Sequence, residues 1–310
     1  MTKSAAWDLH PAGGTVMSLE IDPPFSVVYP QRPTVPCVFN SPHSGSRYPK
    51  TFLAASRLDP LTLRRSEDCH VDQLFAAAVA LGAPMLKANF PRAFLDVNRE
   101  PWELDPAMFD GELPTYVNST SARVAGGLGT IPRIVCEHEE IYAGRLSFRE
   151  AERRIRSYYL PYHAMLQRLM SDTVAQFGVA VLVDCHSMPS SAASGPSARS
   201  SRPDIVLGDR YGSSCEADIA LCLEEALTAQ GLTVIRNKPY AGGHITAAWG
   251  RPGNGTHALQ VEINRGLYMN ELTFRRSQGF ALLERLLTAA LKRFFAALPR
   301  IAIPSRMAAE

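Results

Sequence analysis

Two histidines, His43 and His186, stand where apolar runs of the chain give way to polar turns. Short apolar runs are typical of buried strands, and open α/β sheets bind ligands just beyond the carboxyl ends of such strands. Two imidazoles at that edge predict a zinc site, because imidazole nitrogen is a common zinc ligand. The alternative is that both are hydrogen-bonded structural histidines.

A catalytic zinc ion takes three protein ligands and keeps one position open, so the pair needs a third partner. The candidate is Asp68, at the start of a predicted helix that follows the His43 strand. Glu67 and His70 compete for the same role. An aspartate in a first helical turn can instead be a cap or a partner of the helix dipole.

Glu262 is a charged residue inside an apolar strand, where a carboxylate is costly unless it is paired or bound. It is therefore a candidate general base for a zinc-bound water. The alternative is a buried ion pair, for example with Arg265.

The segment 89–99 combines Arg92 with Asn98 and Arg99. A guanidinium can bind a carboxylate through two parallel hydrogen bonds, and it can stabilise an oxyanion. These residues are candidates for substrate binding and for polarising a carbonyl; the alternative is a set of surface ion pairs. Asp96 could simply orient them.

The segment 240–246 places Tyr240 just before the paired glycines Gly242 and Gly243. Paired glycines let the backbone approach a ligand closely, although they also mark ordinary turns. The tyrosine and both glycines are therefore candidate substrate-binding residues.

The alternation of strands and helices predicts a three-layer α/β/α fold with a mixed, mostly parallel sheet. One domain is expected over residues 31–300, with an arm at 1–30 and a tail at 301–310. Residues 100–146 read as a long irregular segment, and the pattern leaves open whether 189–203 form a lid. The predicted strands are 34–39, 84–89, 93–97, 179–185, 204–208, 232–236 and 257–263, and the predicted helices are 70–81, 147–177, 214–230 and 271–298.

The composition is ordinary for a globular protein, with 310 residues and a formal net charge of +2. Such a charge predicts no nucleic-acid partner, and no apolar run reaches the roughly 18–20 residues that a membrane span needs. No secretory leader is visible, and the six cysteines form no CxxC pair, so we expect reduced thiols and a cytoplasmic location. The oligomeric state is not predicted.

Seven short blocks in this order resemble the N-formylglutamate amidohydrolase family. They are SerProHisSerGly 41–45, GluAspCysHisValAspGlnLeuPhe 67–75, ArgAlaPheLeuAspValAsnArg 92–99, ValAspCysHisSer 183–187, LeuGlyAspArgTyrGly 207–212, ProTyrAlaGlyGlyHisIleThr 239–246 and GlnValGluIleAsnArgGlyLeuTyrMet 260–269. That family is similar in turn to the zinc carboxypeptidases, which implies a phosphorylase/hydrolase-like sheet between helices. It also implies one zinc ion per chain.

The resemblance implies roles for single residues. His43 and the His186–Ser187 pair match carboxypeptidase motifs, but Ser46 stands where those enzymes carry a glutamate ligand, so Asp68 is expected to replace it. Glu262 matches their catalytic glutamate, and Arg92 their carbonyl-polarising arginine. Asn98 and Arg99 resemble their carboxylate-gripping pair, with Arg133 or Arg265 as further carboxylate partners.

The expected activity is zinc-dependent hydrolysis of N-formyl-L-glutamate to formate and L-glutamate, a step of histidine breakdown. One alternative is hydrolysis of another N-acyl amino acid or a small acylated peptide. An alternative of another class is a non-catalytic binding protein that keeps the fold, against which the intact His43, His186 and Glu262 argue.

Overall fold

The computed structural model describes residues 19–135, 139–192 and 203–302. Its centre is a seven-stranded sheet with the order β1-β3-β2-β6-β9-β7-β8. The strands are β1 (Phe25–Val28), β2 (Cys37–Ser41), β3 (Met85–Ala88), β6 (Ala180–Met188), β7 (Ile205–Gly208), β8 (Val234–Arg236) and β9 (Thr256–Asn264). Most of the predicted arm, most of the 189–203 segment and most of the tail lie outside the described residues. The exception in the arm is β1, which forms one edge of the sheet.

Four adjacent strands, β3, β2, β6 and β9, run parallel, and β1 is antiparallel at one edge. β7 runs antiparallel to β9, while β8 is parallel to β7. Parallel neighbours need crossover connections, which place helices over both faces of a sheet. The prediction of a mixed, mostly parallel α/β sheet is therefore confirmed.

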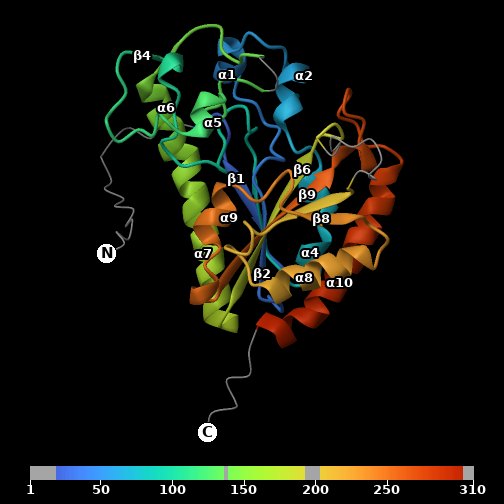
Figure 1. The fold of residues 1–310 in the computed structure, drawn as a ribbon. Coiled ribbons are helices and arrows are strands. Elements are labelled where there is room, and N and C mark those ends of the chain that lie inside the picture. Colours follow the sequence, from blue (N-terminus) through green and yellow to red (C-terminus); the bar gives the residue numbers. More distant parts are fainter. Residues whose placement is uncertain (1–18, 136–138, 193–202, 303–310) are drawn as a thin grey trace.

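Figure 1 shows this sheet between two layers of helices. The even-numbered residues of β6 and β9 face one layer and the odd-numbered residues face the other, because side chains alternate along a strand. The first layer contains α6 (Phe148–Arg154), α7 (Leu160–Phe177) and α9 (His244–Trp249), and the second contains α3 (Val71–Leu74), α4 (Ala77–Ala80), α8 (Ala217–Thr228) and α10 (Gly279–Ala302).

Two predicted helices differ from those observed. The helix expected at 70–81 is divided into α3 and α4 by a turn at Phe75 and Ala76. The last helix begins at Gly279 rather than near Glu271, and it continues past residue 299. Its predicted core stripe is buried as expected: Phe280, Leu283, Leu287, Leu291 and Phe294.

The strand predicted at 93–97 is wrong, since this segment forms turns. The N–H groups of Phe94 and Leu95 both bond to the Pro91 carbonyl, and that of Asp96 bonds to the Thr130 carbonyl. All its apolar residues are buried, so burial alone produced a strand-like pattern. The backbone groups are satisfied by a turn and a loop instead of a neighbouring strand.

A group of short elements covers the end of the sheet where the parallel strands terminate, at the top of Figure 1. They are α1 (Lys50–Ala55), α2 (Pro60–Leu63), η1 (Arg64–Ser66), η2 (Pro106–Met108), β4 (Phe109–Asp110), α5 (Ala122–Ala125) and β5 (Leu146–Ser147). The irregular segment 100–146 therefore contains only brief regular pieces. Between α9 and β9 lies η4 (Pro252–Asn254), and η5 (Arg265–Leu267) follows β9.

The helix expected at 147–177 is continuous but not uniform. Between α6 and α7 it passes through a π-helical segment, η3 (Ile155–Tyr159). Pro161 lies in the first turn of α7, directly after this segment. Proline lacks an N–H and crowds the carbonyl four residues earlier, and the wider π turn accommodates both effects without a break.

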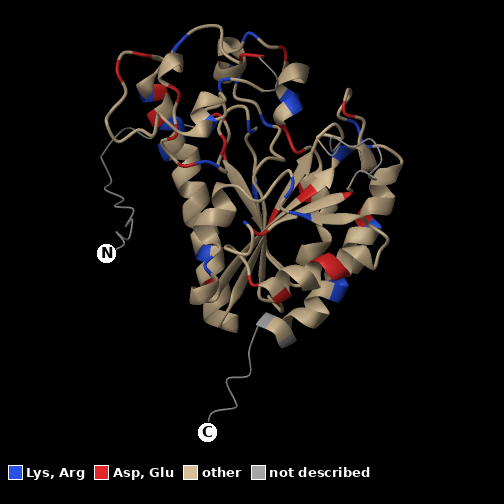
Figure 2. Cartoon of the chain, in the orientation of Figure 1, with Lys and Arg blue, Asp and Glu red and all other residues tan. Residues whose placement is uncertain are grey.

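Lysine and arginine are interspersed with aspartate and glutamate over the molecule (Figure 2). This mixing agrees with the small formal net charge of +2. No helix among the described residues is both long and apolar enough to cross a membrane.

Candidate metal centre and catalytic site

One face of the two central strands changes from apolar to polar along its length. Residues 180, 182 and 258 on this face are alanine or leucine in the core. Closer to the carboxyl ends the same face carries Asp184 and His186 on β6, opposite Gln260 and Glu262 on β9. The opposite face of both strands is apolar at residues 181, 183, 185, 259, 261 and 263. The parallel register thus places four polar side chains side by side.

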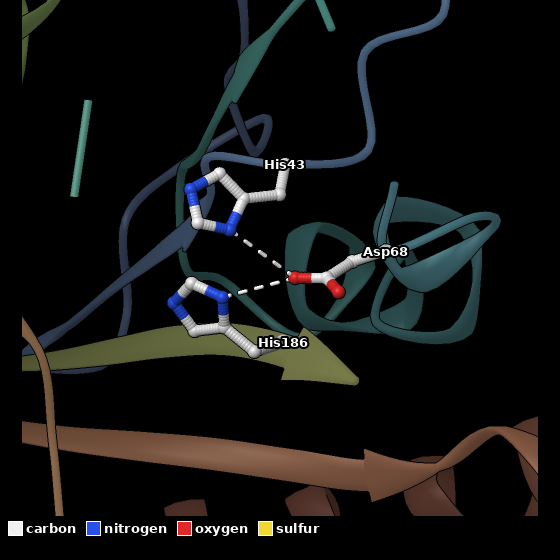
Figure 3. Close-up of side chains that lie close together, drawn as sticks. All are labelled: His43, Asp68 and His186. Atoms are coloured by element: carbon white, nitrogen blue, oxygen red, sulfur yellow. Dashed lines mark hydrogen bonds and ion pairs between the residues drawn. The ribbon is translucent and has the colours of Figure 1, made fainter. Parts of the chain in front are cut away.

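Three predicted ligands meet at this edge of the sheet (Figure 3). His43 follows the end of β2, His186 lies on β6, and Asp68 precedes α3. The Asp68 N–H bonds to the His43 carbonyl at 3.0 Å, which brings the helix start to the strand end. One ligand atom from each residue lies within 4.8 Å of the others, and all three residues are buried. This triad could hold a metal ion.

The outer nitrogen of each histidine is fixed by a carboxylate. His43 Nε2 lies 2.8 Å from Asp96 Oδ1, and His186 Nε2 lies 2.9 Å from Asp184 Oδ2. Donation from both Nε2 atoms leaves the two Nδ1 atoms as acceptors, and both face Asp68 Oδ2, at 3.4 Å and 3.0 Å. Carboxylate–histidine pairs of this kind orient metal-binding imidazoles.

His43 Nδ1 is buried and has no hydrogen-bond partner among the described residues. A buried polar nitrogen without a partner is costly, and here it points at a carboxylate oxygen, another acceptor. Burial alone would raise the pKa of Asp68, but the adjacent imidazoles of His186 and His43 outweigh burial and lower it. A cation among these three atoms would satisfy all of them.

The second oxygen of Asp68 is held by Arg265. Arg265 Nη2 donates to Asp68 Oδ1 at 3.0 Å, and its Nε donates to Ser187 Oγ at 3.1 Å. Its Nη1 donates to the Arg65 carbonyl at 3.2 Å. Every nitrogen of this guanidinium is engaged within the protein. These contacts indicate that Arg265 positions Asp68.

The two competing ligands are occupied elsewhere. Glu67 accepts hydrogen bonds from the Tyr48 hydroxyl at 2.6 Å and from Arg64 Nε at 3.1 Å. His70 Nε2 lies 2.9 Å from the Phe274 carbonyl. Among the described residues, the cluster that could hold a metal ion consists of His43, Asp68 and His186, and it includes neither Glu67 nor His70.

Asp96 connects the metal centre to the arginine segment. Besides His43, it accepts bonds from the Asn98 N–H at 2.8 Å and from Arg92 Nε at 3.0 Å. Arg99 Nη2 lies 3.4 Å from the same carboxylate. Asp96 thus contacts one histidine of the triad and both arginines at once.

The two arginines of this segment differ in how far they are engaged. Arg92 has a side chain 26% exposed, and its terminal nitrogens have no bond to any described residue. Arg99 is buried, donating from Nε to the Leu128 carbonyl and from Nη1 to that of Asn98, each at 2.7 Å. Burial lowers the pKa of Arg99 to about 10.

Glu262 lies beside the triad on β9. Burial raises its pKa to about 7, a value suited to a general base that works near neutral pH. Its Oε1 accepts a hydrogen bond from Gln260 Nε2 at 2.8 Å. Within the described part of the chain it forms no ion pair with Arg265, whose charge is directed at Asp68.

The 240–246 loop, whose last three residues form the first turn of α9, lies against the same face. A Cβ at Gly243 would stand 2.5 Å from Asn98 Oδ1, and one at Gly242 would stand 2.5 Å from Thr246 Oγ1. Glycine is therefore needed here for close packing within the protein. Tyr240 is half-buried against Met188 and Val206.

Two other findings concern Arg133 and the polar strand residues. Arg133 pairs with Asp105 and Glu140, and it makes no recorded contact with the triad among the described residues. Asp184 and Gln260 belong to the site but were missed by sequence reasoning.

Each stands two residues before a site residue on its strand, so its side chain projects from the same face of the sheet. That spacing was the signal in the sequence that could have identified both residues.

Known proteins match this chain over the stretch that contains the site. A family model described as N-formylglutamate amidohydrolase matches residues 35–269. An N-formylglutamate deformylase of Pseudomonas aeruginosa is 30% identical over 251 residues, which are 78% of this chain and 85% of the relative. The deformylase of Pseudomonas putida is 30% identical over 241 residues, or 76% and 83%.

Solved structures agree with this match. The crystal structure of N-formylglutamate amidohydrolase from Ralstonia eutropha JMP134 is 38% identical, with a TM-score of 0.84, and covers 89% of this chain and 99% of that chain. A gene product of Agrobacterium tumefaciens, 18% identical with a TM-score of 0.55 over 88% and 94% of the two chains, shares the fold alone. The chain therefore belongs to the N-formylglutamate amidohydrolase family, a family of amide hydrolases, as its seven motifs predict.

Proposed function

We propose that this protein hydrolyses N-formyl-L-glutamate to formate and L-glutamate, using one zinc ion per chain. The observation that carries the proposal is the buried triad of His43, Asp68 and His186 beside Glu262. The deformylase relatives support the choice of substrate. A place in histidine breakdown follows from that substrate.

The donor set fits zinc. Two imidazole nitrogens and one carboxylate oxygen are the ligand types that zinc accepts, and three protein ligands leave a position open. The unpartnered His43 Nδ1 supports a cation at this point. When bound there, zinc supplies a water with a pKa lowered from 15.7 to about 7 and polarises the substrate carbonyl.

The side chains of the protein would carry the proton and the charge. Glu262 takes a proton from the attacking water, and the same proton passes to the amine nitrogen as the C–N bond breaks. Arg92 is free at its terminal nitrogens, and these would face the carbonyl oxygen as it gains negative charge. Asp96 holds Arg92 and His43 in their relative positions.

Substrate binding is assigned to Asn98, Arg99, Tyr240, Gly242 and Gly243. Arg99 would contact a carboxylate of the glutamate product, since its buried charge is only partly balanced by Asp96 at 3.4 Å. Arg265 is assigned to positioning Asp68, and nothing in the contacts of Arg133 supports a part in binding.

A product assay tests the proposal. The protein is stripped with a chelator, reloaded with zinc, and offered N-formyl, N-acetyl and N-succinyl derivatives of glutamate and glutamine. We expect zinc-dependent release of formate, fastest from N-formylglutamate. Faster cleavage of another acyl group would assign the enzyme to that N-acyl amino acid, and turnover of none by the zinc-loaded protein would refute the proposal.

The proposal includes a cytoplasmic location. The five cysteines among the described residues are buried and unpaired, as suits a reducing compartment. Fractionation of the source cells would test this part.

A further inference from the structure

The side chain of Gln260 connects Glu262 with the loop at residues 240–246. Gln260 stands two residues before Glu262 on β9, so both side chains project from the same face of the sheet. Its Oε1 accepts a hydrogen bond from the Gly243 N–H at 2.7 Å, and its Nε2 donates to Glu262 Oε1 at 2.8 Å. Gln260 is buried, with 5% of its surface exposed.

The orientation of this amide follows from its partners. A backbone N–H can only donate, so the group facing Gly243 must be Oε1 and the group facing Glu262 must be Nε2. One oxygen of Glu262 is thereby occupied. Within the described residues Glu262 has no other hydrogen-bond partner, which leaves Oε2 as the oxygen able to take a proton.

The loop on the other side of Gln260 is itself held firmly. Asn98 Oδ1 accepts a bond from the Ile245 N–H at 2.8 Å, two residues beyond Gly243. Gly243 also packs so closely on Asn98 that a Cβ would stand 2.5 Å from its Oδ1. Two side-chain amides, Asn98 and Gln260, thus anchor the loop, and a fixed Gly243 in turn fixes Gln260.

We propose that Gln260 is a positioning residue that orients Glu262 for proton transfer and couples this orientation to the 240–246 loop. The inference rests on the proposed function, in which Glu262 is the general base. A glutamine suits the position because one side must accept and the other must donate. Glutamate has the same shape without the donor, and leucine lacks both groups.

These two variants separate the two hydrogen bonds. In Gln260→Glu the side chain still accepts from the Gly243 N–H, but its new carboxyl group shares a proton with Glu262 and so competes with the base; in Gln260→Leu both bonds are lost. We expect kcat to fall roughly 10- to 100-fold in both variants, the effect of losing one hydrogen bond to a charged group. KM should rise in Gln260→Leu alone.

A second readout follows the loop without turnover. The Gly243 amide should be protected from hydrogen exchange in the wild type and in Gln260→Glu, and should lose that protection in Gln260→Leu. Zinc content should be unchanged in all three. Gln176→Glu is the matched control, because the Gln176 amide bonds to the Pro33 carbonyl on the exposed side of α7.

A double variant shows whether Gln260 acts through Glu262. In a Glu262→Gln background, Gln260→Leu should lower kcat no further, since coupled residues are not additive. The kinetics are measured with the N-acyl amino acid that the wild type cleaves fastest. If that compound is not N-formylglutamate, the proposed substrate is wrong, but the role of Gln260 is still tested. Normal kcat in a folded Gln260→Leu beside an impaired Glu262→Gln would overturn the positioning role, as would an unprotected Gly243 in the wild type.

Discussion

The two sides of the site are built by different means. The strand wall consists of Asp184 and His186 on β6 and Gln260 and Glu262 on β9, which main-chain pairing holds in register. The loop wall consists of residues 67–70 and 91–99, where turns replace strands. There, side-chain charges hold the structure together, with Asp96 bound to His43, Arg92 and Arg99.

This difference has a consequence for substitutions. A side chain removed from the strand wall leaves its backbone in place, because ladder hydrogen bonds do not depend on it. A charge removed from the loop wall leaves its buried partners unpaired, so neighbouring groups lose position as well. Apart from Gln260, whose side chain also holds Gly243, effects should therefore stay local in the first wall and spread in the second.

The largest loss of activity is expected when the metal ligand of the strand wall, His186, is removed. His186→Ala should lose both the metal and the activity while the fold remains, because β6 keeps its pairing with β2 and β9. Elemental analysis, turnover and the melting temperature of the chelated form check this. Full metal content in His186→Ala would show that this histidine is not a ligand.

The next largest loss of activity is expected from a substitution that removes the general base and leaves the metal ligands intact. Glu262→Gln should keep zinc and lose roughly 10²- to 10⁴-fold in kcat, the contribution typical of general base catalysis. The comparison is kcat at saturating substrate in zinc-loaded protein. A near-normal kcat would make Glu262 structural.

A smaller effect is expected when Asp68, in the loop wall, loses the arginine that holds it. Arg265→Met should weaken zinc binding roughly 10- to 100-fold, as is usual when a partner of a metal ligand is removed. Competition with a chelator measures the Kd for zinc. Arg236→Met is the matched control, because Arg236 pairs with Glu224 and Asp209 instead; equal affinity in both variants would contradict a positioning role for Arg265.

The smallest effect concerns substrate charge. Arg99→Ala should lower kcat/KM for N-formylglutamate by roughly 10-fold more than for N-formylglutamine, since a charged hydrogen bond is worth about 1.5 kcal/mol at the low end. We expect the low end because Arg99 already donates to two carbonyls. Arg133→Ala serves as the control. An equal loss on both substrates would assign Arg99 to folding.

The strand wall could be predicted from the sequence because its information is local. An apolar run with a polar end shows both the strand and the position of His186 and Glu262. Asp184 and Gln260 stand two residues before His186 and Glu262, so the sequence also places them on the same face of the sheet. It does not show which side chains they contact, because those partners come from other parts of the chain.

The loop wall could be predicted only through its motifs. Asp68 was chosen for its nearness to a helix start, but what brings it to the histidines is a main-chain bond to His43. The false strand at 93–97 has the same origin, since its backbone partner, Thr130, lies far along the chain. The engagement of Arg265 and Arg133 by carboxylates likewise depends on tertiary contacts.

The π-helical segment η3 sets the helical phase between two parts of the molecule. Just before it, Arg154 donates to the Phe94 carbonyl at 3.1 Å; at its last residue, the Tyr159 hydroxyl donates to the Arg99 carbonyl at 2.6 Å. Each residue in a helix corresponds to a rotation of about 100°. Deleting one residue from η3 would turn one of these two anchors away from the loop wall, so the length of this helix is constrained to the single residue.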